Sequence, residues 1–138
     1  MSIVQTQTTS FKKELYTAVH NLSTDTIYIA LYTANADLNE ATTVYSATNE
    51  VSGTGYTAGG QALTGVSISS SGYVAYANWD NVAWTAALTA RCALIYNVTQ
   101  GNKSIAVLDF GSDKTSTTTF TITMPANTST TALIRSSN

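Results

Sequence analysis

Few residues in this chain are of the kinds that carry out nucleophilic or zinc chemistry. It contains one histidine, His20, and one cysteine, Cys92. A Ser or Cys nucleophile needs a base beside it, normally a histidine. His20 falls on the polar side of a predicted helix, where we expect a solvated side chain. A single cysteine forms neither an internal disulfide nor a zinc site of standard spacing, so we interpret Cys92 as a buried, inert thiol.

The carboxylates offer the remaining route to catalysis or metal binding. A pair of them could support glycoside hydrolysis, and Asp109 with Asp113 could contribute to a calcium site. Most of the acids stand beside turn residues, where an Asp accepts backbone hydrogen bonds, and no stretch has the dense oxygen-ligand pattern of a calcium loop. We therefore predict no catalytic, metal-binding or cofactor-binding residue and no enzyme activity; a hydrolase, the least favoured alternative, would need two acids converging in a polar pocket. The eight acids are Glu14, Asp25, Asp37, Glu40, Glu50, Asp80, Asp109 and Asp113.

Two short motifs resemble phosphate chemistry but lack its context. The glycine-rich GTGYTAGG at 53–60 has no Lys followed by Ser or Thr, and strand-like sequence follows it instead of a helix. The tripeptide DFG at 109–111 has none of the other kinase motifs around it. We interpret the first as a turn-rich loop and the second as a strand end followed by a glycine turn.

The composition points to a surface coated with hydroxyl groups. Charged residues are 10% of the chain and hydrophobic residues 43%, while Ser and Thr are abundant. Short hydroxyl side chains lose less entropy than Lys or Glu when they are buried against a partner, so this surface suits contact. The alternative is that Thr is common simply because strands favour it.

The charge balance argues against nucleic-acid and membrane partners. The net charge is −2, and the six Lys and Arg residues are scattered, so no basic field is available for phosphates. No stretch approaches the eighteen apolar residues of a membrane span, and no signal peptide is visible. We expect synthesis in a cytosol with no direct nucleic-acid or membrane contact.

The chain begins with a polar, β-prone segment followed by one short helix. Residues 1–9 are predicted to form an extended arm. From Phe11 to Leu22, apolar residues recur at helical spacing. With Ser10 or Thr9 as the N-cap, this pattern predicts a helix over 11–20 that lies across a sheet.

The remaining sequence reads as strands and turns. A single domain over 10–138 is predicted to be all-β, an antiparallel β-sandwich or jelly roll of eight or nine strands with one short N-terminal helix. The stretch GSDKTS at 111–116 is expected to be a loop. The predicted strands cover 26–33, 44–47 (a weak one), 61–69, 73–79, 81–85, 88–99, 103–110, 117–124 and 131–136.

The aromatic residues leave a binding role open. Tyr73, Tyr76, Trp79 and Trp84 lie close together in sequence. On an open sheet face such rings stack on sugars or fit a protein groove, whereas in a small sandwich they more often fill the core. A carbohydrate-binding module would need those rings to be exposed.

Several runs resemble a family of small tailed-bacteriophage virion proteins that includes capsid cement, or decoration, proteins of the jelly-roll or β-sandwich type. These runs are TSFKKELYTAVHNLSTDTIYIALYTANADL, YSATNEVSGTGYTAGGQAL, TARCALIYN and SIAVLDFGSDKTS. The most specific parts are NEVSGTGYTAGG and LDFGSDKTS, and the resemblance extends from about Thr9 to Ile134.

The resemblance implies a homo-oligomer, a dimer or trimer, that binds the major capsid protein on the outside of the icosahedral head. Expected locations are the virion and, during synthesis, the bacterial host cytoplasm. The arm, through Ile3 and Val4, is predicted to add as a strand to a neighbouring subunit. The glycine-rich loop is a second expected contact because backbone can approach a partner closely there; its residues are Gly53, Gly55, Tyr56 and Gly59. The alternative is a tail or head-fibre module that binds a receptor or carbohydrate.

Overall fold

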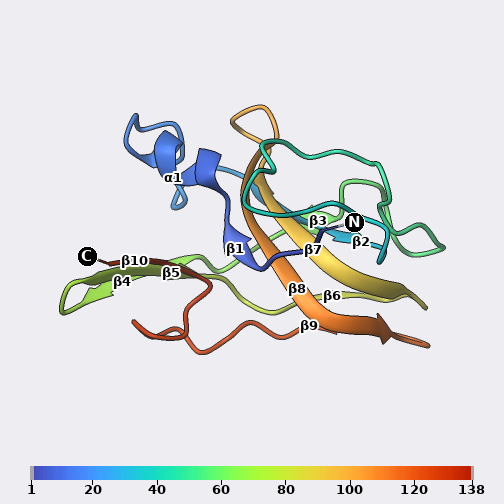
Figure 1. Cartoon of the computed structure of the whole chain (residues 1–138). Helices are drawn as coiled ribbons and strands as arrows, with labels where there is room; N and C mark the ends of the chain where they lie inside the picture. Colours follow the sequence, from blue (N-terminus) through green and yellow to red (C-terminus); the bar gives the residue numbers. More distant parts are fainter. Residues whose placement is uncertain (1, 138) are drawn as a thin grey trace.

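The computed structural model describes residues 2–137; Met1 of the predicted arm and Asn138 of the predicted domain lie outside the described residues. As predicted, the chain is mostly β, with antiparallel sheets and one short helix (Figure 1). The described range contains ten strands instead of eight or nine, because two of them are only two residues long. The elements are β1 Thr6–Gln7, α1 Thr9–Leu15, β2 Ile27–Tyr32, β3 Gln61–Ala62, β4 Ser67–Ser71, β5 Val74–Asn78, β6 Val82–Trp84, β7 Thr89–Asn97, β8 Lys103–Thr115, β9 Phe120–Ile122 and β10 Ile134–Ser136.

The strands form three sheets. The largest has five strands in the order β1-β8-β7-β2-β3, a second has the order β10-β5-β4, and β6 pairs with β9. In Figure 1 the long strands β7 and β8 run across the middle of the molecule, and the β4–β5 hairpin extends to one side with β10. Sequence-adjacent strands β4 and β5 and strands β7 and β8 form hairpins, so much of the pairing is local.

The five-stranded sheet is buried on both faces. Side chains of alternate residues in β2, such as Ile29 and Leu31, join a core that also contains residues of the two smaller sheets. The residues between them, such as Ala30 and Tyr32, join a second cluster under the long 33–60 connection. Period-two alternation places successive residues on opposite faces, and here both faces are apolar. Burial of Cys92 within the second cluster confirms the prediction of a buried thiol, and burial raises its pKa to about 11.

One core connects all three sheets. Aliphatic residues of β7 and β8, such as Ile95 and Ile105, belong to the same buried cluster as Trp84 of β6, Phe120 of β9 and Ile134 of β10. Packing against the inner face of the large sheet holds the two smaller sheets, together with hydrogen bonds from Gln7 Nε2 to Arg135 O at 2.7 Å and from Gln61 Nε2 to Ala83 O at 2.6 Å.

The helix is shorter than predicted and begins earlier. It covers Thr9–Leu15, and its N-cap is Thr8, whose Oγ1 accepts a hydrogen bond from Phe11 N at 3.3 Å. The predicted N-caps, Ser10 and Thr9, were wrong, because Thr8 is itself buried and also bonds Ser104 Oγ at 2.9 Å. The helix ends before the predicted limit because Ala18 adopts φ +60°. No helix among residues 2–137 is long and apolar enough to cross a membrane.

His20 is buried, so the expectation of a solvated side chain was wrong. It follows the helix, its ring lies 5.0 Å from that of Phe11, and its Nε2 is 2.8 Å from Glu14 Oε1. Its Nδ1 faces Asn97 Nδ2 at 3.0 Å. Because an amide nitrogen only donates, Nδ1 is the acceptor, and the proton is on Nε2 and is donated to Glu14.

Asn97 joins this histidine to a second carboxylate. Its Nδ2 also donates to Asp25 Oδ2 at 2.8 Å, and its Oδ1 accepts from Gln100 N at 3.2 Å. Burial alone raises the pKa of Asp25, but hydrogen bonds from Asn21 N, Asn97 and Gln100 outweigh it and leave the pKa below its usual value. The network ties the turn after α1 to the end of β7.

Several strands differ from the sequence prediction; the strand predicted over 61–69, for example, is divided into β3 and β4, which belong to different sheets. The weak strand at 44–47 is wrong, because Val44 makes only a single bridge, to Lys103. The predicted loop at 111–116 is also wrong for most of its length, because β8 continues to Thr115 through an irregular stretch. The residues of β8 beyond Phe110 are exposed.

We predict that Asn97→Ala lowers the free energy of unfolding by about 2–4 kcal/mol, because it leaves Nδ1 of the buried His20 without its donor and removes the Asn97 side-chain bonds to Asp25 and Gln100. Urea denaturation measures the loss. Asn35→Ala, at an exposed position, is the matched control and should change stability by less than about 0.5 kcal/mol. Equal effects of the two variants would contradict a structural role for the network.

Candidate functional site

A hollow lies beside an irregularity in β8. Cys92 pairs with Asp109 and Ala90 pairs with Lys114, so two steps along β7 correspond to five along β8. Asp109 forms an ion pair with Arg91, and its Oδ1 accepts from Gly111 N at 2.8 Å. Gly111 has φ +83°, a conformation that favours glycine. These interactions hold the bulged residues away from the regular ladder.

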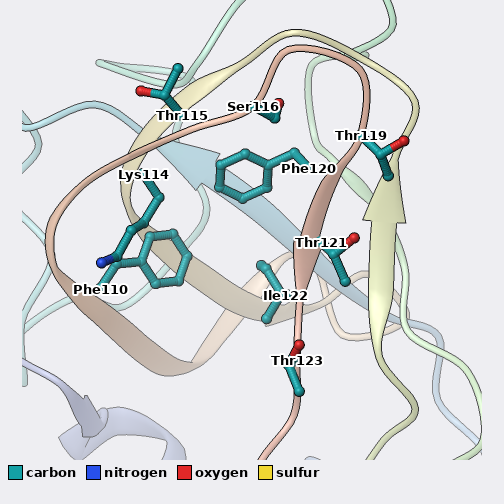
Figure 2. A pocket seen from close by; sticks show the side chains of 9 residues that line it. All are labelled: Phe110, Lys114, Thr115, Ser116, Thr119, Phe120, Thr121, Ile122 and Thr123. Atoms are coloured by element: carbon teal, nitrogen blue, oxygen red, sulfur yellow. The ribbon is translucent and has the colours of Figure 1, made fainter.

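The hollow, which we call the β8–β9 groove, has a volume of about 530 Å³ and lies between the bulge and β9 (Figure 2). Phe110, which is half-buried, lies on the bulge side, and its ring centroid is 6.3 Å from that of Phe120. Phe120 and Ile122 are buried and complete an apolar floor. The polar residues that line the groove are Lys114, Thr115, Ser116, Thr119, Thr121 and Thr123.

The groove has an apolar floor and a polar rim. No carboxylate, histidine or cysteine lines it, and its one charged group is Lys114. An apolar floor with a polar rim is the arrangement found at the centre of protein interfaces, where the floor takes a side chain and the rim bonds the partner's backbone. The groove therefore suits an apolar side chain in an extended segment.

A second cavity, with a volume of about 470 Å³, lies next to the groove. Thr115 and Ser116 line both hollows and form the ridge between them. Ser116 is held by Leu88 N, which donates to its Oγ at 3.0 Å, and by its own donation to Ala86 O at 2.8 Å. The ridge is thus rigidly attached to the segment before β7, and together the two hollows extend the contact surface.

Glu50, which lines the second cavity, organises the glycine-rich loop. Its Oε1 accepts from Tyr45 Oη at 2.5 Å, and its Oε2 accepts from Tyr56 Oη at 2.6 Å and Gly59 N at 2.7 Å. Tyr96 Oη in turn donates to Gly59 O at 2.6 Å, and the Tyr96 and Tyr45 rings stack at 4.7 Å. This Glu50 network fixes the loop over the outer face of the large sheet.

The phenols of the network are held in their neutral form. Burial, helped by the charge of Glu50, raises the pKa of Tyr32, Tyr45 and Tyr56 far above the usual value. Burial, the Glu50 charge and Tyr28 raise the pKa of Tyr96 to about 12. A neutral phenol can donate to Glu50, whereas a phenolate would repel it.

The predicted arm lies along its own chain. Ile3 bridges Leu38, Val4 N donates to Leu38 O at 2.9 Å, and Thr6 pairs with Val107 of β8. Val4 is 41% exposed and Ile3 is half-buried. Addition of the arm to a neighbouring subunit stays a prediction, and it would require these internal bonds to be released.

The predicted contact glycines Gly53, Gly55 and Gly59 face other parts of their own chain. A Cβ on Gly55, which has φ +93°, would lie 2.6 Å from Thr85 O. Tyr56 is buried, and its Oη accepts from Leu31 N at 2.9 Å while donating to Glu50. Gly53 bridges Tyr56, and Gly59 belongs to the Glu50 network. The groove and these predicted residues are therefore separate, and the sequence analysis missed Phe110, Phe120 and the threonine rim.

Trp79 and Trp84 are each 5% exposed, so a carbohydrate platform made of these two rings is wrong. Trp84 packs between Tyr56 and Phe120, and its Nε1 has no hydrogen-bond partner in the described part of the chain. Among residues 2–137, each of the five principal cavities is lined by at most one carboxylate, and no group of three His, Cys, Asp or Glu residues is placed to hold a metal.

Comparison of the chain with protein-family models, with curated proteins and with solved structures gives no match. Its function is therefore inferred from its own residues and geometry.

We predict that Glu50→Gln lowers the free energy of unfolding by about 1–3 kcal/mol and accelerates amide exchange over 53–60, because an amide replaces one of the two acceptor oxygens. Hydrogen exchange read by NMR measures the local effect. Glu40→Gln, at an exposed position, should leave exchange in the loop unchanged. Loop exchange at the wild-type rate in Glu50→Gln would show that Glu50 does not hold the loop.

We also predict loss of stability in alkali. Because the folded state raises the pKa of Tyr96 to about 12, the unfolded chain loses its phenolic proton first, near the usual value of 10.0. The stabilisation is complete below pH 10.0 and decreases as pH rises toward about 12. Urea midpoints across this range measure it, and Tyr96→Phe should flatten the decrease. A constant midpoint would refute the prediction.

Proposed function

We propose that this chain is a structural protein of a tailed-bacteriophage virion, a β-sandwich of the jelly-roll type that decorates the outside of the capsid and stabilises contacts between capsomers of the major capsid protein. The observation that carries the proposal is the β8–β9 groove, an apolar floor of Phe110, Phe120 and Ile122 framed by threonines, with no reactive group. The sequence resemblance to cement proteins gives the class of partner.

The two stretches with the most specific resemblance form the β8 bulge and the loop that is held by Glu50. LDFGSDKTS forms the bulge with its Arg91–Asp109 pair and one side of the groove. NEVSGTGYTAGG carries Glu50, which fixes the loop beside the adjoining cavity. Such pre-ordered loops favour binding because little conformational entropy remains to be lost on contact.

Decoration of a shell fits a surface of this composition. A head filled with packaged DNA gains stability from extra buried area across the seams between capsomers, and a rigid domain adds that area without chemistry. Many symmetric copies act together, so each contact can be modest. Since charged residues are only 10% of the chain, the contact should depend weakly on salt.

A tail or head-fibre module that binds a receptor or carbohydrate is the second candidate. It is favoured by two tyrosines that are almost fully exposed, Tyr16 at 90% and Tyr73 at 88%. Tyr73 lies at the tip of the β4–β5 hairpin, beside Gly72 with φ +57°. Exposed tyrosines suit recognition because the ring offers contact area and the hydroxyl a hydrogen bond.

The proposal is tested by adding the purified chain to phage heads that lack it and measuring saturable co-sedimentation. We predict that Thr121→Arg, at an exposed position lining the groove, lowers occupancy at least about tenfold, because burial of an unpaired charge at an interface costs several kcal/mol. Thr24→Arg, exposed in the turn before β2, is the matched control and should bind as the wild type does.

Failure of the wild-type chain to bind heads would contradict the capsid role, and saturable binding to isolated tails instead would support the appendage. Equal binding of both arginine variants would remove the groove from the contact. Thermal unfolding of each variant shows that a loss of binding does not come from loss of the fold.

A further inference from the structure

The β8–β9 groove borders the unpaired edge of a strand. Within the described residues β9 pairs only with β6, and β8 pairs with β1 and β7, so no backbone ladder joins β8 to β9. Phe120 has its cross-strand neighbour Trp84 on β6 at 6.4 Å and Phe110 of the bulge at 6.3 Å, both measured between ring centroids. Figure 2 shows Phe110 and Phe120 side by side in the groove. The free edge of β9 is therefore turned toward the bulge.

The residues that line the groove indicate that this edge is accessible. Five consecutive residues, 119–123, line it. Side chains of a strand point alternately to opposite faces, so a surface that covers one face meets every second residue, whereas an edge offers consecutive residues. Apart from the pairing with β6, no hydrogen bond among the described residues involves 117–123. The outward N–H and C=O groups of β9 are thus available to another strand.

The side chains around this edge alternate in the same way. Thr119, Thr121 and Thr123 are exposed, whereas Phe120 and Ile122 are 5% and 7% exposed. The half-buried ring of Phe110 is the apolar side chain that a partner reaches most readily. A strand added beside β9 would place one set of its side chains against Phe110 and the other set beside the threonines. The fitting segment therefore alternates apolar residues with small polar ones.

The charge of the groove favours an acidic residue in that segment. Lys114 is exposed, and its amine has no ion pair or hydrogen bond among the described residues. Its neighbour Asp113 does not line the groove, and Asp109 is paired with Arg91. An acid on the partner would complement the uncompensated positive charge and fix the register of the added strand.

We propose that the partner binds this groove by strand addition: an extended segment with alternating apolar residues and a terminal acid pairs with the free edge of β9, packs on Phe110 and forms an ion pair with Lys114. The inference rests on the proposed function, in which the groove is the contact with the major capsid protein, and it names the element that the partner supplies.

The N-terminal arm of a second copy is the competing occupant. Residues 2–7 contain no acid. They are also bonded within their own chain, where Val4 N donates to Leu38 O at 2.9 Å and Thr6 pairs with Val107. Occupation of the groove by the arm would require those bonds to be released and would leave Lys114 without a partner charge.

The test is an NMR titration of the full chain, at low ionic strength, with the acetylated and amidated hexapeptide TLTVTE. We expect saturable shifts over residues 109–123 and slower amide exchange in β9. N–H groups of alternate residues point to opposite edges of a strand. N-methylation of the leucine and valine nitrogens in one compound, and of the threonine nitrogens in another, should therefore weaken binding at least about tenfold in one compound and much less in the other.

The charge is tested by exchanging both partners. The wild-type chain should bind TLTVTE about two- to fivefold more tightly than TLTVTK, the effect of one exposed ion pair. Lys114→Glu should reverse this preference. Lys12→Glu, also at an exposed position but outside the groove, is the matched control and should keep it. Thermal unfolding confirms that both variants keep the fold.

Absence of saturable shifts, equal binding of the two N-methylated compounds, or an unchanged preference in Lys114→Glu would overturn the proposal. Tighter binding of a peptide of residues 2–7 than of TLTVTE would assign the groove to the arm of a second copy instead. Peptide binding without binding to phage heads would contradict the capsid role and leave strand addition standing. Binding to heads without any peptide binding would contradict strand addition alone.

Discussion

The constraint on which the rest of the structure depends is the burial of the five-stranded sheet on both faces. β2 and β7 place apolar side chains on each side, so the inner face must be covered by the small sheets and the outer face by the 33–60 connection. A connection this long has no strand pairing to hold it in place over most of its length. Glu50 supplies that hold by accepting hydrogen bonds from Tyr45, Tyr56 and Gly59 N, which keeps a polar, glycine-rich segment fixed over an apolar surface.

The burial of both faces of the large sheet also affects where apolar surface remains accessible. Gly55 and Gly60 are used for close internal approach and both tryptophans lie in the core, while Ser and Thr are abundant in the chain. Apolar surface is reachable where β8 departs from its ladder, and the Arg91–Asp109 pair keeps that departure in one conformation. A pre-formed apolar groove framed by threonines is the feature on which the proposed contact with a partner rests.

Much of the secondary structure could be predicted from the sequence, because strands such as 27–32 and 89–97 carry long apolar runs bounded by turn residues. The short helix was misjudged because the apolar stripe continues past Leu15 while the backbone turns at Ala18. His20 bonds Asn97, which is 77 positions away, and Asp109 at the bulge pairs with Arg91, which is 18 positions away. Local sequence patterns do not reveal such long-range contacts. The groove was missed because it also depends on contacts between separate strands. The sequence feature that could have indicated it is the Thr-rich run around Phe120, which follows directly after LDFGSDKTS.

Electron cryomicroscopy of tailed-phage heads incubated with the purified chain tests the proposed capsid role most directly. The account predicts density for many symmetric copies over the outer shell, with the bulge and β9 facing the major capsid protein and Phe110 covered. Particles without the chain on the shell, or copies confined to the tail with the β8–β9 groove open to solvent, would contradict it.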